Sequence, residues 1–222
     1  VGSLLPALLL GVAFANIFAG IPIDREGIFH GNLLTLLNPY GLAGGVFFVL
    51  LFSVHGALWL ANKAEGALRE RAQHTIRVLW IALAIVAVAF LAFTWFATSL
   101  WQNLLARPFL LLLPAVAVAG LLGTRLFVAR RELWKAWFAS CATIVGSTLF
   151  GVAGLYPALL PSSLDPSYSR TAFNTQSSPL TLSIMLGVAL VMVPVVIAYQ
   201  SWVYYRFKDP VTVKSLALED LY

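Results

Sequence analysis

One histidine of this sequence lies within an apolar run, and its imidazole is the group there that is best suited to ligate a metal ion. His55 lies in the segment FSVHGALWL, and imidazole is a usual axial ligand of haem iron. A bis-histidine site needs a second histidine at the same depth, but His30 and His74 fall in polar stretches between apolar runs. We therefore expect His55 to hydrogen-bond to a neighbouring helix, and haem ligation is the less favoured alternative.

The sulfur-containing residues indicate no redox or metal site. Cys141 is the single cysteine, so neither a disulfide framework nor a thiolate metal site is expected. Met185 and Met192 are spaced by about two helical turns and could share a face as thioether ligands, but packing is the commoner role of methionine. The sequence thus predicts no catalytic, cofactor-binding or metal-binding residue in this chain.

Small residues recur at helical spacing after a polar start in the segment NPYGLAGG, residues 38–45. Asn38 suits the N-cap of a helix and Pro39 its first position, where the missing N–H costs nothing. Gly41, Gly44 and Gly45 then share one face, which lets a second helix approach closely. A phosphate-binding loop is the alternative, but no strand precedes these glycines and their spacing differs from G-x-G-x-x-G.

A second face of small residues follows at helical spacing later in the chain: Ser140, Thr143, Ser147, Gly151 and Gly154. Helix packing is the favoured interpretation. A hydroxyl-lined path for water, protons or oxygen is the alternative that the sequence leaves open.

The composition indicates that these faces belong to membrane helices. The chain of 222 residues is 60% hydrophobic and 10% charged, whereas soluble domains carry about 25% charged residues. The net charge of +5 does not indicate nucleic-acid binding, because the basic residues are spread between apolar runs. We expect an all-α fold, a polytopic transmembrane helical bundle forming one domain over 1–222. Its six predicted spans are about 1–21, 41–62, 78–98, 108–128, 136–157 and 180–204.

The basic residues also predict the orientation. Most of the 14 Lys and Arg residues follow spans two, four and six, on one side of the membrane. The loops on the other side have only Arg25, Arg107 and Arg170. Because Lys and Arg favour the cytoplasmic side, the carboxyl-terminal tail 205–222 is predicted to be cytoplasmic. Aromatic residues near span ends form a predicted interfacial belt, on which a quinone ring could also stack: Trp95, Trp101, Trp134, Trp137, Trp202, Tyr204 and Tyr205.

Four segments carry a family resemblance. They are GVAFANIFAGIP (11–22), GNLLTLLNPYGLAGG (31–45), HGALWLANKAEGALRERA (55–72) and PSSLDPSYSRTAFNTQSSPLTLSIMLGVALVMVPVVIAYQSWVYYRF (161–207). Together and in this order they resemble the second subunit of the cytochrome bd type quinol oxidases. The resemblance extends over nearly the whole chain.

The resemblance implies a role in a bacterial or archaeal plasma membrane. The complex would oxidise quinol and reduce oxygen to water, generating a proton motive force without pumping. Two haems b and a haem d would belong to the partner, the haem-bearing subunit I, and this chain would support it. Small single-span accessory subunits, lipid and quinone are further expected partners, and nucleic acid is not.

The chain departs from the family in length. Family members carry additional amino-terminal spans, so the sequence looks like the carboxyl-terminal piece of something longer. The polar residues of those spans have no counterpart here, and no role in proton uptake is carried over. Two alternatives remain at this point: a small-solute permease or channel subunit, and a free-standing scaffold without an enzyme partner.

Overall fold

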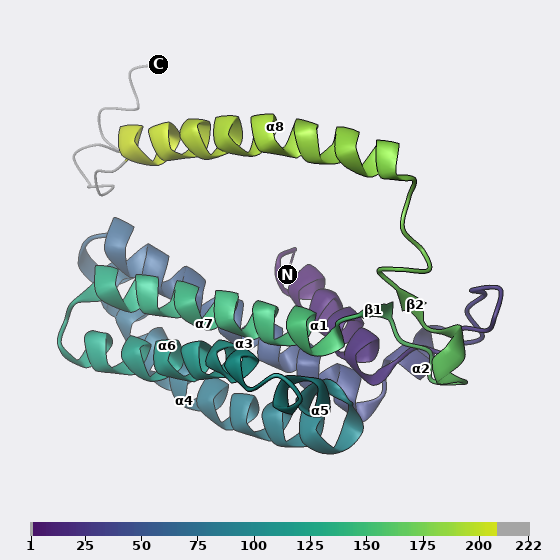
Figure 1. Ribbon diagram of the computed structural model, residues 1–222. Coiled ribbons are helices and arrows are strands. Elements are labelled where there is room, and N and C mark those ends of the chain that lie inside the picture. The colour runs from purple at the N-terminus through teal and green to yellow at the C-terminus, as the bar shows by residue number, and fades with distance from the viewer. Residues whose placement is uncertain (1, 208–222) are drawn as a thin grey trace.

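The computed structural model describes residues 2–207 and is mainly helical (Figure 1). Two short strands, β1 (Ala158–Leu160) and β2 (Arg170–Thr171), pair antiparallel. Pro108–Leu111 and Pro166–Tyr168 form short 3-10 helices. The α-helices are α1 (Leu4–Ala19), α2 (Leu33–Leu36), α3 (Pro39–Lys63), α4 (Gly66–Ala97), α5 (Leu100–Leu105), α6 (Leu112–Ala129), α7 (Leu133–Leu155) and α8 (Pro179–Arg206).

The predicted all-α membrane bundle is confirmed, with one difference at its start. Five helices are long and apolar enough to cross a membrane: α3, α4, α6 with the 3-10 turn before it, α7 and α8. The first predicted span, 1–21, corresponds to the shorter α1 of 16 residues. This helix ends early because Gly20 adopts a φ of 90° and Ile21 then pairs with Ser162.

Two stretches between the predicted spans are helical. α4 begins at Gly66, well before the predicted start of the third span at residue 78, so the polar stretch after α3 continues as helix. The stretch between the predicted spans 78–98 and 108–128 contains α5, because burial of Leu100 and Leu104 against Phe150 stabilises a helical turn there. Of the predicted tail 205–222, residues 208–222 lie outside the described residues.

Helix starts follow local capping chemistry. The Asn38 side chain accepts a hydrogen bond from the N–H of Gly41 at 2.7 Å, and Pro39 occupies the first helical position of α3. Ser178 and Pro179 play the same two roles at the start of α8. These side chains satisfy backbone donors that a helix leaves unpaired at its first turn.

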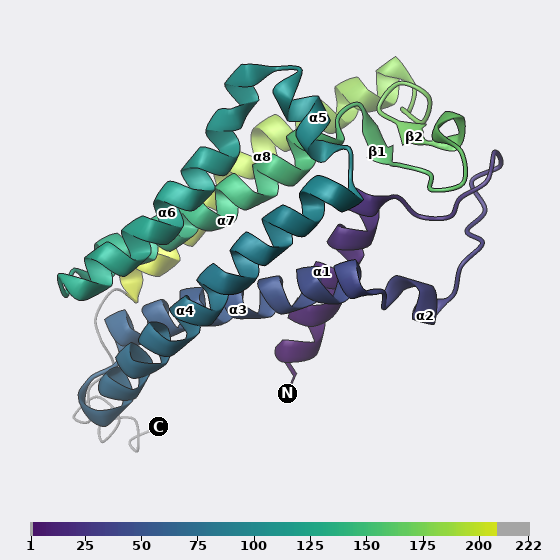
Figure 2. The same cartoon turned by 90° about the horizontal axis from the view of Figure 1, so that it is seen from below.

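α3 is the central helix of the bundle. It packs against α1, α4 and α7, while α6 and α7 form an antiparallel pair (Figures 1 and 2). The main core consists of buried apolar residues from these helices, among them Leu51, Val54, Leu58, Ala61, Ile76, Leu83 and Ala136. α3 therefore joins α1 and α4 to the pair of α6 and α7.

Glycines set the closest approach of α1 to α3. A methyl group placed on Gly44 would lie 2.6 Å from Cβ of Ala15 and 2.8 Å from the carbonyl oxygen of Gly11. Gly45 lies similarly close to Leu8, and Gly41 to the side chain of Asn16. No side chain larger than hydrogen fits here without moving the two backbones apart.

The second small-residue face meets several neighbours rather than one. Gly151 lies against the ring of Phe18 in α1, and Gly154 against Leu100 in α5. Ser147, about one turn before Gly151, is half-buried. The tight contact between α6 and α7 uses Gly120 and Gly146, two glycines that the sequence analysis did not single out.

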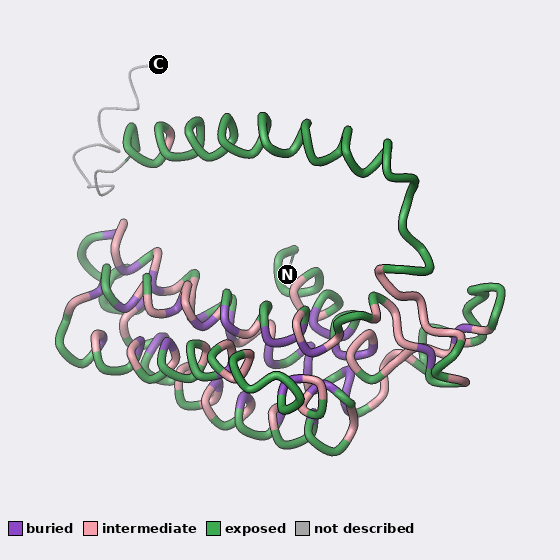
Figure 3. The backbone as a smooth tube through the Cα atoms, in the orientation of Figure 1, coloured by how far each residue is buried: buried purple, intermediate pink, exposed green. Residues whose placement is uncertain are grey.

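α8 stands apart from the bundle (Figures 1 and 3). None of its residues is buried. Its carboxyl-terminal end reaches α3, where the rings of Trp59 and Tyr204 lie 5.5 Å apart and Lys63 Nζ donates to the carbonyl oxygen of Phe207 at 2.9 Å. The rest of α8 presents apolar side chains outward.

The glycine contact predicts the effect of a bulky substitution. Gly44→Leu should destabilise the chain by about 1–3 kcal/mol or more, because the added atoms meet the Ala15 Cβ and the Gly11 backbone, neither of which can rotate away. The measurement is the thermal unfolding midpoint of the detergent-solubilised protein, together with its yield after size-exclusion chromatography.

Gly56→Leu is the matched control, because Gly56 lies exposed in the same helix with no atom within 4 Å of an added methyl. Equal unfolding midpoints for the two variants would show that the close approach at Gly44 is unimportant for stability.

Candidate functional site

The intramembrane histidine of α3 bonds to α7. His55 Nδ1 lies 2.8 Å from Ser140 Oγ, and the imidazole ring packs on Trp137 with ring centroids 5.3 Å apart. The Ser140 hydroxyl donates to the carbonyl oxygen of Trp137 at 2.7 Å. Since that hydroxyl has one hydrogen, its oxygen accepts from His55 Nδ1–H. The pair therefore joins two helices and has a defined tautomer.

The described residues do not fit a haem site. His30 lies in the loop after α1 and His74 is exposed in α4, so neither reaches the depth of His55. Met185 and Met192 are exposed on α8. Within residues 2–207, no three His, Cys, Asp or Glu side chains are grouped closely enough to hold a metal ion. We derive no redox step in this chain from these residues.

Two further polar contacts join helices inside the bundle. The Asn38 amide donates to Asn16 Oδ1 at 2.7 Å, and Asn16 Nδ2 donates to the carbonyl oxygen of Leu36 at 2.7 Å. Tyr40 and Thr94 hydroxyls lie 2.9 Å apart and are both buried. The sequence analysis missed Asn16, although a lone asparagine in an apolar run is a signal for a polar helix contact.

Aromatic rings gather where α3, α7 and α8 meet. Trp59 lies 5.9 Å from Trp134 and 5.5 Å from Trp137 between ring centroids, and Tyr204 completes the group. The Lys63 ammonium lies 5.4 Å from the centre of the Trp59 ring. Three residues of the predicted interfacial belt, Trp134, Trp137 and Tyr204, thus form one cluster. Trp59 belongs to this cluster, although the sequence analysis did not name it.

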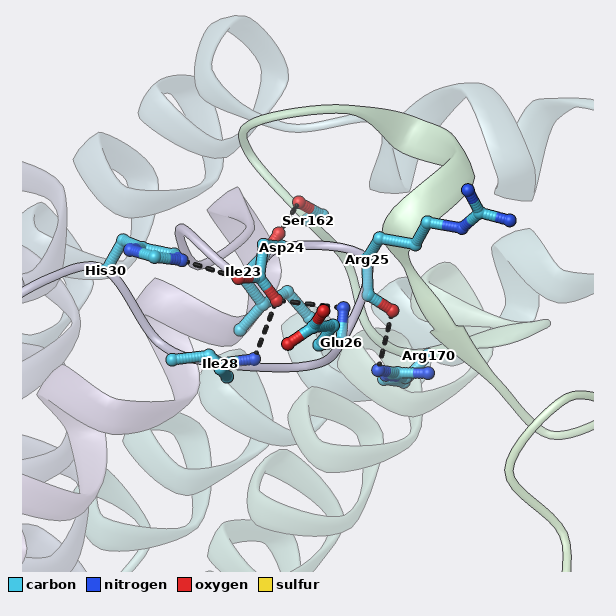
Figure 4. Close-up of polar contacts among 8 residues, drawn as sticks. All are labelled: Ile23, Asp24, Arg25, Glu26, Ile28, His30, Ser162 and Arg170. Atoms are coloured by element: carbon cyan, nitrogen blue, oxygen red, sulfur yellow. Dashed lines mark hydrogen bonds and ion pairs between the residues drawn. The ribbon is translucent and has the colours of Figure 1, made fainter.

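The loop after α1 folds around the carboxylate of Asp24 (Figure 4). Asp24 Oδ1 accepts from the N–H groups of Glu26 and Ile28, both at 2.9 Å, and Oδ2 lies 2.6 Å from His30 Nε2. The hydrogen bond from His30, followed by the one from Ile28, holds the pKa of Asp24 below its usual range. The sequence analysis missed this site, because the path of the loop decides which groups reach the Asp24 carboxylate.

A second loop closes over the first one. The Ser162 hydroxyl donates to the carbonyl oxygen of Ile23 at 2.6 Å and is buried, and Arg170 Nη2 donates to the carbonyl oxygen of Arg25 at 3.1 Å (Figure 4). Gly27, with a φ of 87°, leaves room for the Arg170 guanidinium. Segments 20–30 and 158–171 therefore form one cap at the end of the bundle where α1 ends.

The lowered pKa of Asp24 predicts how this cap responds to acid. A carboxyl group with a lowered pKa stabilises the fold at pH values above its ordinary pKa of about 4. This stabilisation is lost as the pH falls through the folded-state pKa. Protection of residues 20–30 from proteolysis should decrease as the pH falls below about 4.

Asp24→Asn should lower this protection at neutral pH and remove most of its dependence on acid. Asp165 also has a lowered pKa, through its hydrogen bonds to Ser167. An unchanged pH profile in Asp24→Asn would therefore assign the acid response to another carboxylate and contradict the prediction.

Comparisons with known proteins agree with this architecture. The family model described as cytochrome bd terminal oxidase subunit II matches residues 1–207. A probable cytochrome oxidase subunit 2 of Haemophilus influenzae is 32% identical, over 92% of this chain and 62% of that protein. The cytochrome bd ubiquinol oxidase subunit 2 of Bacillus subtilis is 29% identical, over 96% of this chain and 63% of that protein.

A solved structure shows the same fold. The bd oxidase from Geobacillus thermodenitrificans superposes with a TM-score of 0.65 and 14% identity, covering 91% of this chain and 61% of that chain. The chain thus spans less than two thirds of the length of these relatives. The resemblance seen in the sequence motifs is confirmed, and this multi-pass membrane chain belongs to the cytochrome bd terminal oxidase subunit II family.

Proposed function

We propose that this chain is part of subunit II of a respiratory cytochrome bd quinol oxidase, supporting a haem-bearing subunit I. The observation that carries the proposal is the family match over residues 1–207. The complex oxidises quinol and reduces oxygen to water in a bacterial or archaeal plasma membrane. Quinol protons are released on the outer side and protons for water are taken up from inside, which generates a proton motive force without pumping.

In this proposal the chain is a structural rather than a catalytic subunit. Several of its intramembrane polar groups pair with one another across helix contacts, as His55 does with Ser140 and Tyr40 with Thr94. Groups that are hydrogen-bonded in this way stabilise helix association and are poorly placed to carry protons along a path. The two haems b and the haem d belong to subunit I.

The remaining partners follow from the surfaces of the bundle. α8 exposes apolar side chains along its length, which suits contact with lipid or another membrane protein. The basic residues after α3, α6 and α8 support a cytoplasmic carboxyl terminus. Small accessory subunits and a bound quinone are part of the proposal, whereas the family match does not support the permease alternative.

A reduced-minus-oxidised absorption spectrum tests this function. Purification through a tag on this chain, in mild detergent, should yield a complex with b-haem bands and a far-red band typical of a chlorin-type haem. A monodisperse preparation of the intact chain without haem would contradict the proposal and return the free-standing scaffold to consideration.

The His55→Ala variant tests where the haems lie. We expect an unchanged haem spectrum, because His55 bonds to Ser140 and no second histidine reaches its depth. Ser140 keeps its hydrogen bond to Trp137 in this variant, so the stability should fall by only about 1 kcal/mol, typical of one hydrogen bond. The measurement is haem content per complex with the thermal unfolding midpoint. Loss of one haem signal from an assembled complex would identify His55 as a ligand.

A further inference from the structure

An open cavity of about 430 Å³ lies at the end of the bundle where α3 ends, α4 begins and α6 turns into α7. Segments 62–69 and 131–135, far apart in sequence, supply its walls. Its lining includes Asn62, Arg69, Arg131, Glu132, Trp134 and Lys135. None of these residues takes part in the function proposed above.

The charged side chains of this cavity leave an excess of positive charge. Lys135 Nζ lies 3.0 Å from Glu132 Oε1, and Glu132 Oε2 is buried without a hydrogen-bond partner in the described residues. Three basic side chains and this one carboxylate line the cavity, which leaves a net positive charge. Among residues 2–207, no carboxylate lies within ion-pair distance of Arg69 or Arg131. Two guanidinium groups therefore face one cavity without an acidic partner in the described chain. Guanidinium groups bind phosphate through paired hydrogen bonds.

The start of α7 adds backbone donors to the same wall. α7 has 23 residues, and its N-cap residue, Glu132, makes no side-chain capping bond. The N–H groups of the first turn, at residues 133–135, point away from the helix without intrahelical partners. The positive end of the helix dipole favours an anion at this position. The arginines and the helix start thus favour the same class of ligand.

The aromatic cluster indicates where such an anion comes from. Trp134 lines the cavity and packs on Trp59 and Trp137. Tryptophans at helix ends lie at the level of lipid headgroups, and basic pockets between membrane helices bind acidic headgroups. We propose that this cavity binds the phosphate of an anionic phospholipid, held by Arg69, Arg131 and the start of α7.

Lipid titration of the unmodified protein tests this proposal. The complex is purified with the full chain, depleted of lipid by detergent exchange, and titrated with phosphatidylglycerol or zwitterionic phosphatidylcholine while native mass spectrometry counts retained lipids. We expect phosphatidylglycerol to bind about tenfold more tightly, as for a contact with charge-assisted hydrogen bonds. Equal binding of the two lipids overturns the proposal.

A pair of double variants locates the site. Arg69→Gln with Arg131→Gln should weaken phosphatidylglycerol binding about tenfold. The control is Arg71→Gln with Arg130→Gln, which removes the same charge from exposed neighbours that do not line the cavity. Equal weakening by both pairs would indicate a general effect of net charge and overturn the proposal. If the complex that carries Arg69→Gln and Arg131→Gln fails to assemble, the lipid titration of the unmodified protein still tests the proposal.

Two competing occupants are separated in the same assay. Binding of inorganic phosphate to the lipid-depleted protein, together with equal binding of phosphatidylglycerol and phosphatidylcholine, would identify a free anion as the ligand and overturn the lipid assignment. The chain segment 208–222 carries Asp209, Glu219 and Asp220 and is the other candidate. A chain ending at Phe207 should bind lipid as the full chain does. Lipid binding seen only after this truncation would assign the cavity to the tail and overturn the proposal.

Discussion

The close approach of α1 and α3 at Gly11 and Gly44 is the contact on which the arrangement of the bundle depends. Lipid tails are as apolar as the helix surfaces, so burial from water cannot hold membrane helices together. Van der Waals contact over short distances replaces it, and glycine allows two backbones to reach that range. Since α3 also packs on α4 and α7, its position transmits this contact to the rest of the bundle.

Polar groups complete the helix contacts that glycines begin. Asn16 and Asn38 bond where α1 meets α3, Tyr40 and Thr94 where α3 meets α4, and His55 with Ser140 joins α3 to α7. An unpaired polar group in hydrocarbon costs free energy, so each pair specifies one helix register. This arrangement suits a subunit whose role is to hold a shape beside a catalytic partner.

The two ends of the bundle differ in chemistry. At one end, loops close over each other through backbone carbonyls, Ser162 and Arg170. At the other end, basic side chains surround an open cavity next to tryptophans. A membrane protein needs both kinds of end, because one must satisfy loop backbone away from lipid and the other meets charged headgroups.

Hydropathy and helix capping were sufficient to predict the fold class, most helix boundaries and the start of α3 at Asn38 and Pro39, and the sequence motifs were sufficient to indicate the family. These features depend on residues near one another in the chain, and a helix satisfies its backbone locally. The partners of His55 and Asn16, the tight contacts at Gly120 and Gly146, and the cap around Asp24 required the tertiary structure. Each of these contacts joins side chains that are brought together by the crossing of whole helices and loops. The crossing angle of two helices depends on the shapes of both packed surfaces, which the sequence near one residue does not specify.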